Sequence, residues 1–464
     1  MAAHPAASPA EARKAVSHAH PTPLSSTRAS ALSGRIRVPG DKSISHRALM
    51  FGAIATQRTT ITGLLEAEDV LNTAKALRAL GCPITKAGTK TGATWEVLGR
   101  GVGGLTEPTG DLDFGNSGTG TRLMMGLIAG HDMTVRMTGD ASLSKRPMAR
   151  VLDPLKRMGV EVLDGATRLP LSLRGTSDLI PIEYRLPVPS AQLKSAILIA
   201  GLHAAGATTV IEAEATRDHT ERMLRHFGAE VTAVERDGLR AITVKGDGEL
   251  EGRAVVVPGD PSSAAFLVAA ALIVPGSEIT IEGVLVNPTR TGFYTTLREM
   301  GADVAFLNER EEGGEPIADV RVRHCKLSGV RVPPERAPSM IDEYPMLACV
   351  AAYANGETRM EGLAELKVKE SDRLAATADG LIANGVAARA EGDTLIVQGG
   401  NGVRGGGMVA THLDHRIAMA FLTLGLGADR AVTVDDTAMI ATSFPEFRGL
   451  MEDLGAKFSD PETR

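Results

Sequence analysis

Apolar residues recur three and four positions apart in several segments of the chain, and each of these segments ends at a glycine. Residues 71–80 (LNTAKALRAL) and 220–227 (TERMLRHF) are two examples. This spacing places the apolar side chains on one face of a helix, and glycine suits the left-handed residue that closes a helix. The segments that follow, such as 160–163 (VEVL) and 302–306 (ADVAF), alternate as strands do. The pattern predicts an α/β fold of repeated helix–strand units.

Six copies of this helix end occur at similar intervals along the chain. Their glycines are Gly81, Gly159, Gly228, Gly301, Gly385 and Gly455. A longer repeat relates VPGDKSISHRALM (38–50) to VPGDPSSAAFLVA (257–269). Repetition at two levels predicts two similar domains of three αβ units each, with the chain passing between domains at the VPGD sequences. We expect one domain to span residues 41–256 and the other to combine residues 33–40 with 257–464.

The N-terminal segment 1–32 differs from the rest of the chain, because it is rich in Ala, Ser, Pro and His and lacks apolar periodicity. This composition predicts a disordered N-terminal extension. The longest apolar run, residues 264–274, is too short to cross a membrane. The three cysteines, Cys82, Cys325 and Cys349, are isolated, as is typical of a protein of the reducing cytoplasm.

Charge and motif context exclude several classes of function. A net charge of -6 and an aromatic content of 3% argue against a nucleic-acid-binding protein. The segment 99–104 (GRGVGG) matches a dinucleotide-binding pattern, but no helix-forming sequence follows it, and the chain contains no P-loop. His412, Asp414 and His415 crowd into four residues, which favours an anion contact or a structural histidine over a metal site. We expect neither a metal nor a cofactor.

Six cationic segments contain Gly, Ser or Thr or lie directly next to one, so that backbone N–H groups and side chains can both face an anion. They are 40–47 (GDKSISHR), 115–122 (GNSGTGTR), 142–148 (SLSKRPM), 190–196 (SAQLKSA), 367–374 (KVKESDRL) and 412–419 (HLDHRIAM). Because they are spread over both halves, they predict one cleft that both domains line and that holds strongly anionic ligands. Asp342 and Glu370 lie among these segments and are the candidates for acid–base chemistry.

Ten motifs in order, from about residue 33 to the C-terminus, resemble the 5-enolpyruvylshikimate-3-phosphate synthase family, and most closely its bacterial class II branch. They are GDKSISHR, GNSGTGTR, KRPM, SAQLKSA, TRDHT, GDPSS, SMIDEYP, KESDRL, LDHRIAM and TSFPEF. The resemblance implies a two-domain inside-out α/β barrel with six βαβαββ-type repeats and its active site in the cleft. It implies an enzyme that transfers the enolpyruvyl group of phosphoenolpyruvate to shikimate-3-phosphate without a cofactor. We expect a cytoplasmic monomer, because the two domains already form the cleft between them, and no nucleic-acid or membrane partner.

The resemblance also implies roles for individual residues. The shikimate-3-phosphate contacts would be Lys42, Ser43, Arg47, Ser190, Gln192, Arg217, Asp342 and Lys369. The phosphoenolpyruvate contacts would be Lys42, Asn116, Gly118, Thr119, Arg146, Gln192, Arg373, His415 and Arg416. Lys42, Asp342 and Glu370 would be catalytic: Asp342 would take the proton of the 5-hydroxyl, Glu370 would handle the proton on the methylene carbon, and Lys42 would touch both substrates.

Two alternatives share the predicted scaffold. The sister enolpyruvyl transferase that acts on UDP-N-acetylglucosamine usually carries a cysteine on a mobile loop, but the matching stretch here, 139–148 (GDASLSKRPM), has none. A non-catalytic anion-binding homologue would be expected to lack Lys42, Asp342 or Glu370. One position departs from the family pattern, because Ala441 stands where many members have a lysine before the Thr/Ser-Phe-Pro segment. Glyphosate is the family's known inhibitor, and we expect it to inhibit this enzyme because Gly118 leaves the pocket wall without a side chain.

Overall fold

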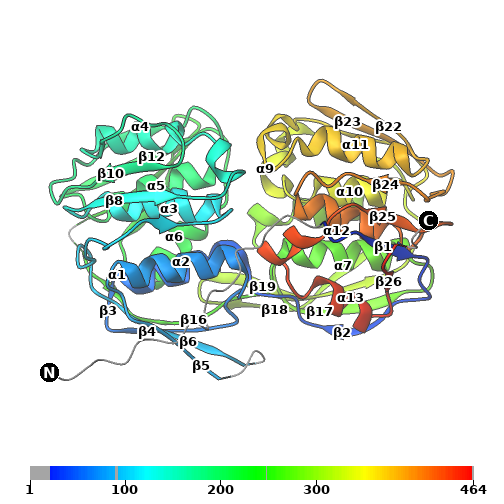
Figure 1. Ribbon diagram of the computed structural model, residues 1–464, viewed down its shortest axis with the longest axis horizontal. Helices are drawn as coiled ribbons and strands as arrows, with labels where there is room; N and C mark the ends of the chain where they lie inside the picture. Colours follow the sequence, from blue (N-terminus) through cyan, green and yellow to red (C-terminus); the bar gives the residue numbers. More distant parts are fainter. Residues whose placement is uncertain (1–20, 89–91, 247, 462–464) are drawn as a thin grey trace, which may run out of the picture.

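The computed structural model describes residues 21–88, 92–246 and 248–461, and it has two lobes side by side (Figure 1). The N-terminal lobe comprises the elements from α1 (Lys42–Ile54) to β16 (Ala254–Val256). The C-terminal lobe comprises β1 (Leu24–Thr27), β2 (Ser33–Ile36) and the elements that follow β16. Each lobe surrounds its own large cluster of buried hydrophobic residues.

The described residues form six four-stranded sheets, three in each lobe, and all six have the same topology. One edge strand runs parallel to its neighbour, and the other two pairings are antiparallel. In the N-terminal lobe the sheets are β16 with β4 (Arg58–Thr62), β6 (Thr94–Leu98) and β5 (Ile84–Ala87); β7 (Leu112–Asp113), β8 (Thr134–Thr138), β10 (Leu171–Arg174) and β9 (Glu161–Val162); and β11 (Glu183–Arg185), β12 (Ala207–Glu212), β14 (Leu239–Lys245) and β13 (Val231–Arg236). In the C-terminal lobe they are β18 (Asp303–Glu312), β19 (Glu315–Arg323), β17 (Glu278–Leu285) and β2; β20 (Arg331–Val332), β21 (Gly356–Met360), β23 (Thr394–Gly399) and β22 (Ala387–Glu391); and β24 (Met408–Val409), β25 (Val432–Val434), β1 and β26 (Lys457–Ser459).

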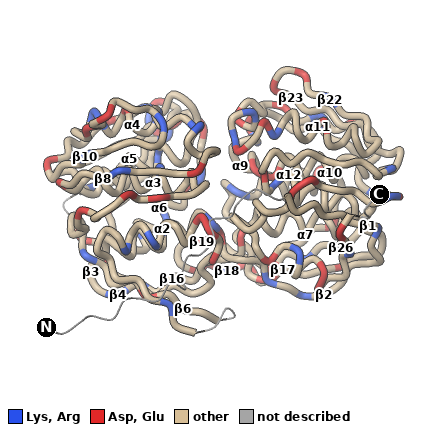
Figure 2. The backbone as a smooth tube through the Cα atoms, viewed as in Figure 1, with Lys and Arg blue, Asp and Glu red and all other residues tan. Residues whose placement is uncertain are grey.

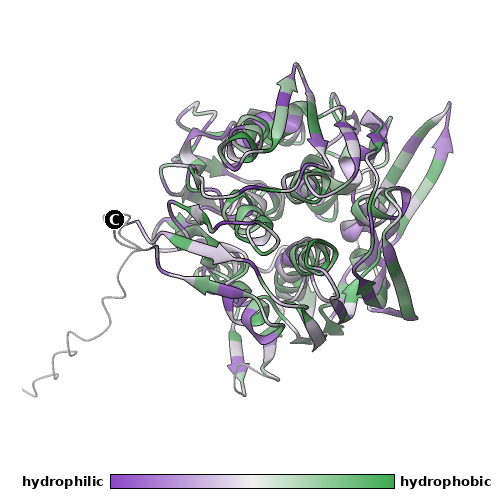
Figure 3. Ribbon diagram, turned by 90° about the vertical axis from the view of Figure 1, so that its right-hand side faces the viewer, coloured by the Kyte–Doolittle hydropathy of each residue, from purple (hydrophilic) through white to green (hydrophobic). Residues whose placement is uncertain are grey.

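Helices fill the centre of each lobe and the sheets lie around them (Figures 1 and 3). The helices of the N-terminal lobe are α1, α2 (Glu68–Ala79), α3 (Gly118–Ile128), α4 (Ala149–Arg157), α5 (Ala191–Gly201) and α6 (His219–His226). Those of the C-terminal lobe are α7 (Pro261–Ile273), α8 (Gly292–Glu299), α9 (Ala337–Met340), α10 (Tyr344–Ala351), α11 (Arg373–Ala383), α12 (His415–Leu424) and α13 (Phe447–Asp453). This arrangement is the inside-out α/β architecture that the resemblance implied.

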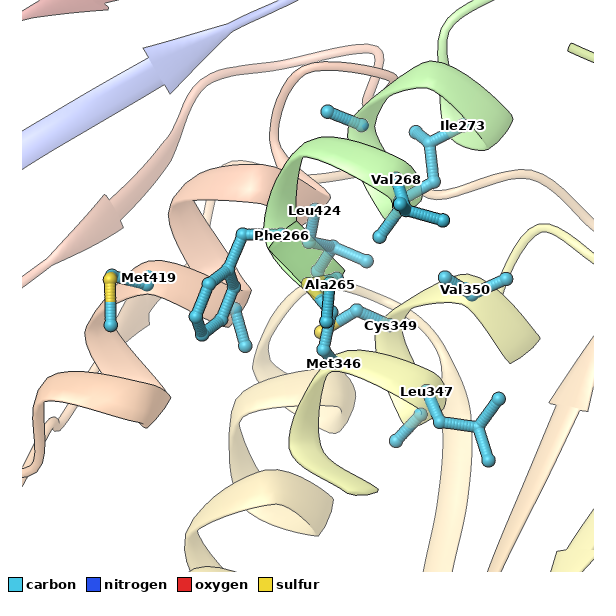
Figure 4. Packing of buried hydrophobic residues seen from close by; sticks show 14 of the residues in the cluster. Ala265, Phe266, Val268, Ile273, Met346, Leu347, Cys349, Val350, Met419 and Leu424 are labelled. Carbon is cyan, nitrogen blue, oxygen red and sulfur yellow. The ribbon is translucent and has the colours of Figure 1, made fainter. Parts of the chain in front are cut away.

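The longest apolar run of the sequence forms most of α7, every residue of which is buried. Helices α10 and α12 pack on it, with Phe266 and Met419 on facing helices and Ala265 close to Met346 and Cys349 (Figure 4). Burying one large apolar side chain contributes about 1.5–3 kcal/mol, so helices that are apolar all round are stable only at such a centre. Several of the helices seen nearly end-on in Figure 3 carry green, hydrophobic residues.

The structure corrects the prediction that the whole N-terminal segment 1–32 is disordered. Strand β1 lies between β25 and β26 and supplies a central strand of the last sheet, with Leu24 opposite Val434. Leu24 and Leu32 are both buried. Two single leucines in a polar segment produce no periodicity, so the sequence pattern did not reveal a strand whose pairing partners lie near the other end of the chain. Residues 1–20 lie outside the described part of the chain.

The two VPGD sequences lie together where the chain passes between the lobes. The N–H of Asp41 donates to the Pro258 carbonyl (2.7 Å), and the N–H of Asp260 donates to the Pro39 carbonyl (2.8 Å). The side chains of Asp41 and Asp260 cap α1 and α7 by accepting backbone N–H groups. Gly40 is required at this crossing because a Cβ there would lie 2.0 Å from the carbonyl oxygen of Gly63. The repeated sequence therefore begins the first helix of each lobe at the same place.

Candidate active site

Helices from both lobes begin at one cavity of about 310 Å³. In the N-terminal lobe, Ser43 lies in the first turn of α1, Gly118 begins α3, and Ser190 caps α5. In the C-terminal lobe, Arg373 begins α11 and His415 begins α12. The N-terminus of a helix carries free N–H groups and a partial positive charge, so this convergence favours anionic ligands.

All the residues that the sequence predicted for the site line this cavity. From the N-terminal lobe they are Lys42, Ser43, Arg47, Asn116, Gly118, Thr119, Arg146, Ser190, Gln192 and Arg217, and from the C-terminal lobe Asp342, Lys369, Glu370, Arg373, His415 and Arg416. The lining contains ten Lys and Arg residues against six Asp and Glu residues, whereas the whole chain has a net charge of -6. Charges of both signs are spread over the two lobes (Figure 2), so the positive excess is a local property of the cavity.

Asp342 lies on the C-terminal side of the cavity among four cations. Its carboxylate pairs with Arg217 of the opposite lobe (2.8 Å) and with Arg373 (3.2 Å). The Nε atom of Arg416 and the Nζ atom of Lys369 each lie 4.0 Å away. Burial raises the pKa of Asp342, but these four positive charges outweigh it and hold the pKa well below the ordinary value. Asp342 is therefore ionised at neutral pH and can accept a proton.

Glu370 pairs with one arginine from each lobe. Its Oε2 atom accepts a hydrogen bond from Nη2 of Arg373 (2.5 Å), and its Oε1 atom lies 3.5 Å from Nη1 of Arg146 in the N-terminal lobe. Burial raises the pKa of this carboxyl as well, but Arg373 and Arg146 hold it well below its usual value. Glu370 is ionised as long as these two guanidinium groups have no other anion to bind.

Asp414, in the His-Asp-His cluster at residues 412–415, binds Arg373 and caps α12. Its carboxylate accepts a hydrogen bond from Nε of Arg373 (2.8 Å) and another from the N–H of Arg416 (2.9 Å), which caps α12. His415 is buried, and burial lowers its pKa to about 3, so the imidazole is neutral. The cluster thus orients an arginine at the cavity, in agreement with the anion-contact interpretation of the sequence.

Arg47 contributes to the cavity wall, but its guanidinium is already engaged by the protein. It donates to Oγ1 of Thr220 (2.7 Å), to Oγ of Ser195 (2.8 Å) and to the Ser43 carbonyl (2.9 Å). These bonds join α1 to α5 and α6 near the place where the three helices begin. A substrate contact by Arg47 would therefore add to a structural role that sequence reasoning did not anticipate.

Sequence reasoning missed several residues of the lining. Arg122 donates to Oε1 of Gln192 (2.8 Å), whose Nε2 atom donates to Oγ1 of Thr119 (2.9 Å). Arg122 ends the motif GNSGTGTR, one helical turn after Gly118, so the helical period could have placed it in the site. Asp69 pairs with Lys42 (3.1 Å) but lies in no cationic segment, and it left no signal in the sequence.

A second cavity, of about 680 Å³, lies at the opposite ends of α3 and α5. Its lining includes Glu107, Glu249, His131 and His203, and none of its described lining residues is Lys or Arg. Burial lowers the pKa of His203 to about 3 and also lowers that of His131, so both imidazoles are neutral. This cavity does not suit anionic substrates.

No helix among the described residues is long and apolar enough to cross a membrane.

Two similar α/β lobes line a cation-rich cavity that contains ionised carboxylates, and this arrangement suits an enzyme that binds anionic substrates and moves protons. Comparison with known proteins gives the particular family. The family model described as EPSP synthase (3-phosphoshikimate 1-carboxyvinyltransferase) matches residues 26–451. The chain therefore belongs to the EPSP synthase family.

Proteins named 3-phosphoshikimate 1-carboxyvinyltransferase resemble the chain over almost its whole length. One from Methylobacterium sp. (strain 4-46) is 60% identical over 446 residues, which cover 95% of this chain and 99% of the relative. One from Parvibaculum lavamentivorans is 60% identical over 439 residues, which cover 94% of this chain and 96% of the relative. A solved structure of EPSP synthase from Acinetobacter baumannii superimposes with a TM-score of 0.84 at 43% identity, covering 94% of this chain and all of that chain. The likeness confirms the predicted α/β fold class.

Proposed function

We propose that the chain transfers the enolpyruvyl group of phosphoenolpyruvate to the 5-hydroxyl of shikimate-3-phosphate, giving 5-enolpyruvylshikimate-3-phosphate and phosphate. The observation that carries the proposal is the set of cations around Asp342, drawn from both lobes and next to the carboxylate of Glu370. The reaction needs cations for two phosphorylated substrates and two groups that move protons. Membership of the EPSP synthase family supports the same assignment.

In the proposed reaction Asp342 accepts the proton of the 5-hydroxyl as its oxygen attacks C2 of phosphoenolpyruvate. Glu370 gives a proton to the methylene carbon, which yields a tetrahedral ketal phosphate. Phosphate then leaves as the C–O bond breaks, and Glu370 recovers a proton from the methyl group, so the enol double bond forms again. The arginines would stabilise the charges that develop on phosphate and carboxylate.

We assign Lys42, Ser43, Arg47, Ser190, Gln192, Arg217 and Lys369 to shikimate-3-phosphate, together with Asp342. Lys42 and Gln192 would also contact phosphoenolpyruvate, with Asn116, Gly118, Thr119, Arg146, Arg373, His415 and Arg416. The support for this division is the position of Arg146, whose Nη2 atom donates to Oδ1 of Asn116 (2.6 Å) beside Glu370. Arg217 lies instead beside Asp342, where the attacking hydroxyl would lie.

We further propose that the enzyme belongs to the class II bacterial branch and acts as a cytoplasmic monomer. Its two domains would be residues 41–256 and residues 33–40 with 257–464, the second of them extended by β1. The ten motifs quoted from the sequence support the branch, and the cavity formed by two lobes of one chain supports a monomer. Buried Cys82 and Cys349 and half-buried Cys325 have free thiols, which suits the cytoplasm.

The test is a phosphate-release assay with phosphoenolpyruvate and each of two acceptors. We expect turnover with shikimate-3-phosphate and none with UDP-N-acetylglucosamine. Identification of the product by mass spectrometry would show whether the enolpyruvyl group has been transferred to the acceptor. Turnover with UDP-N-acetylglucosamine, or with neither acceptor, would contradict the proposal.

A further inference from the structure

A hairpin of the C-terminal lobe reaches helix α6 of the N-terminal lobe. Strands β18 and β19 extend toward the N-terminal lobe at the junction of the two lobes (Figure 1). At the tip of the hairpin, the Gly314 carbonyl accepts a hydrogen bond from Nη1 of Arg222 (3.1 Å). Glu315 follows at the start of β19, and only 1% of its surface is exposed. A buried carboxylate at a contact between lobes requires partners.

The partners of Glu315 come from both lobes. Its Oε1 atom lies 2.8 Å from Nδ1 of His219 in the N-terminal lobe, and its Oε2 atom accepts from Nδ2 of Asn287 (2.8 Å) in its own lobe. The same Nδ2 atom of Asn287 donates to Oδ1 of Asp218 (2.7 Å), again in the N-terminal lobe. One buried amide group therefore joins carboxylates of the two lobes.

This network holds the two residues that directly follow Arg217. Arg217 lies outside helix and strand, just before α6, and it extends across the cavity to Asp342. We propose that Glu315 and Asn287 are positioning residues for Arg217: by fixing Asp218 and His219 from the opposite lobe, they set where the guanidinium meets shikimate-3-phosphate. This inference rests on the proposed function. A guanidinium held in place before binding loses less conformational freedom when the ligand arrives.

The substitution Asn287→Asp removes the Nδ2 atom that donates to both Asp218 and Glu315. An aspartate keeps the Oδ1 acceptor that receives the N–H and the hydroxyl of Thr289 (2.9 and 2.8 Å). It replaces the shared N–H donor by an oxygen that faces the carboxylates of Asp218 and Glu315. Loss of hydrogen bonds to charged groups weakens binding about ten-fold or more, so we expect KM for shikimate-3-phosphate to rise by that factor. We expect kcat to change less.

Asn308→Asp, in the β18–β19 hairpin, is the control, because it is the same substitution at an asparagine of the C-terminal lobe that also donates to a carboxylate, but to one in its own lobe. Nδ2 of Asn308 donates to Oδ2 of Asp319 (2.9 Å), also in the C-terminal lobe. Asn308 has a φ of 51°, which aspartate tolerates well. We expect this variant to keep the wild-type KM for shikimate-3-phosphate. An equal rise in KM for both variants would overturn the inference.

A double-mutant cycle separates positioning from general structural support. If Asn287 acts through Arg217, Asn287→Asp adds little to the rise in KM that Arg217→Ala already causes. Independent, multiplicative effects would overturn the inference. Glu315→Gln, which removes the charge and one acceptor, is expected to raise KM in the same way. Loss of folding in both Asn287→Asp and Glu315→Gln would also contradict a positioning role, whereas a wild-type protein without turnover would contradict the proposed function instead.

Discussion

Arg217 of the N-terminal lobe and Asp342 of the C-terminal lobe form an ion pair across the cleft, with 2.8 Å between Nη2 and Oδ2. Arg373 of the C-terminal lobe pairs with the other carboxylate oxygen of Asp342 at 3.2 Å. The cations proposed to bind substrate phosphate and carboxylate groups are thus neutralised in part by the carboxylates proposed to move protons. Anionic ligands would have to replace the two carboxylates as the partners of these cations. Ligand binding would therefore change the pKa values of Asp342 and Glu370.

Replacing Asp342 by Asn is expected to lower kcat by about 100- to 10,000-fold, the range typical of losing one positioned acid or base. Because the pKa of Asp342 lies well below the ordinary value, the wild-type carboxylate stays ionised through the neutral range. Its protonation would therefore reduce kcat/KM only at a pH below the range in which an ordinary aspartate takes up a proton. Steady-state phosphate release over a pH series measures both effects. A variant with near-normal turnover would show that Asp342 is not the base.

Glu370 is expected to take up a proton when phosphoenolpyruvate binds. In the structure Arg373 and Arg146 hold its pKa low, but a general acid must be protonated. Phosphoenolpyruvate would share these guanidinium charges and bring its own negative charge, and both changes raise the pKa of Glu370. Calorimetric titration in two buffers of different ionisation enthalpy measures the proton uptake. Glu370→Gln should abolish it and lower turnover by about 100- to 10,000-fold.

The two substrates should depend on different arginines. We expect Arg146→Ala to weaken chiefly phosphoenolpyruvate and Arg217→Ala to weaken chiefly shikimate-3-phosphate, because Arg146 lies beside Glu370 and Arg217 beside Asp342. Losing a hydrogen bond to a charged group costs roughly 1.5–3 kcal/mol, or about ten- to a hundred-fold in affinity. Separate titrations of each ligand test the division. Equal losses of both ligands in both variants would contradict it.

Lys194 should matter for stability rather than for turnover. It is fully buried and lies between Glu212 (3.2 Å) and Glu221 (2.8 Å). Lys194→Met would remove the cation that pairs with buried Glu221 and leave Glu212 with Arg240 alone, 3.6 Å away, and breaking a buried pair typically costs about 3–5 kcal/mol in the free energy of unfolding. Lys245→Met is the control, because Lys245 and its partner Glu230 are largely exposed and such pairs contribute about 0–1 kcal/mol. Urea unfolding of both variants measures the difference, and equal midpoints would contradict the prediction.

The class of fold could be predicted because the repeated units can be recognised in the amino-acid sequence itself. Helix ends such as Leu80-Gly81 recur, and the VPGD sequences cap α1 and α7 in the same way. Local patterns did not reveal that β1 completes the last sheet, because its partners are remote and its four residues include no repeating apolar period. Pairing between distant strands is a property of the folded chain.

The candidate site was predictable where chemistry follows a local motif. Arg373 stands in KESDRL, and its segment alone indicates an anion contact. Its buried partner Asp414 and the bridge from Asn287 to Glu315 depend on elements brought together from different parts of the chain. Residue types and their spacing along the chain do not show which distant residues come into contact in the fold.

Glyphosate is expected to inhibit the enzyme competitively with phosphoenolpyruvate, because Gly118 leaves the cavity wall without a side chain. A Cβ at this position would lie 3.0 Å from Nη1 of Arg122 and 3.1 Å from Nη1 of Arg146. Both guanidinium groups would have to move by a few tenths of an ångström. We expect Gly118→Ala to weaken the inhibitor more than the substrate, because glyphosate is the longer molecule and has less room to adjust.

Inhibition series at several phosphoenolpyruvate concentrations, on wild type and Gly118→Ala, measure this change in discrimination. Gly449→Ala is the control, because a Cβ at Gly449 would meet no atom within 4 Å. Its inhibition constant should equal that of the wild type. A wild type that is insensitive to glyphosate would show that the pocket excludes the inhibitor elsewhere. Ala441, where the family resemblance led us to expect a lysine, would be the position to change next. If glyphosate inhibits the wild type and the Gly118→Ala variant equally well, Arg122 and Arg146 accommodate the added methyl group. The pocket wall at residue 118 then does not select between glyphosate and phosphoenolpyruvate.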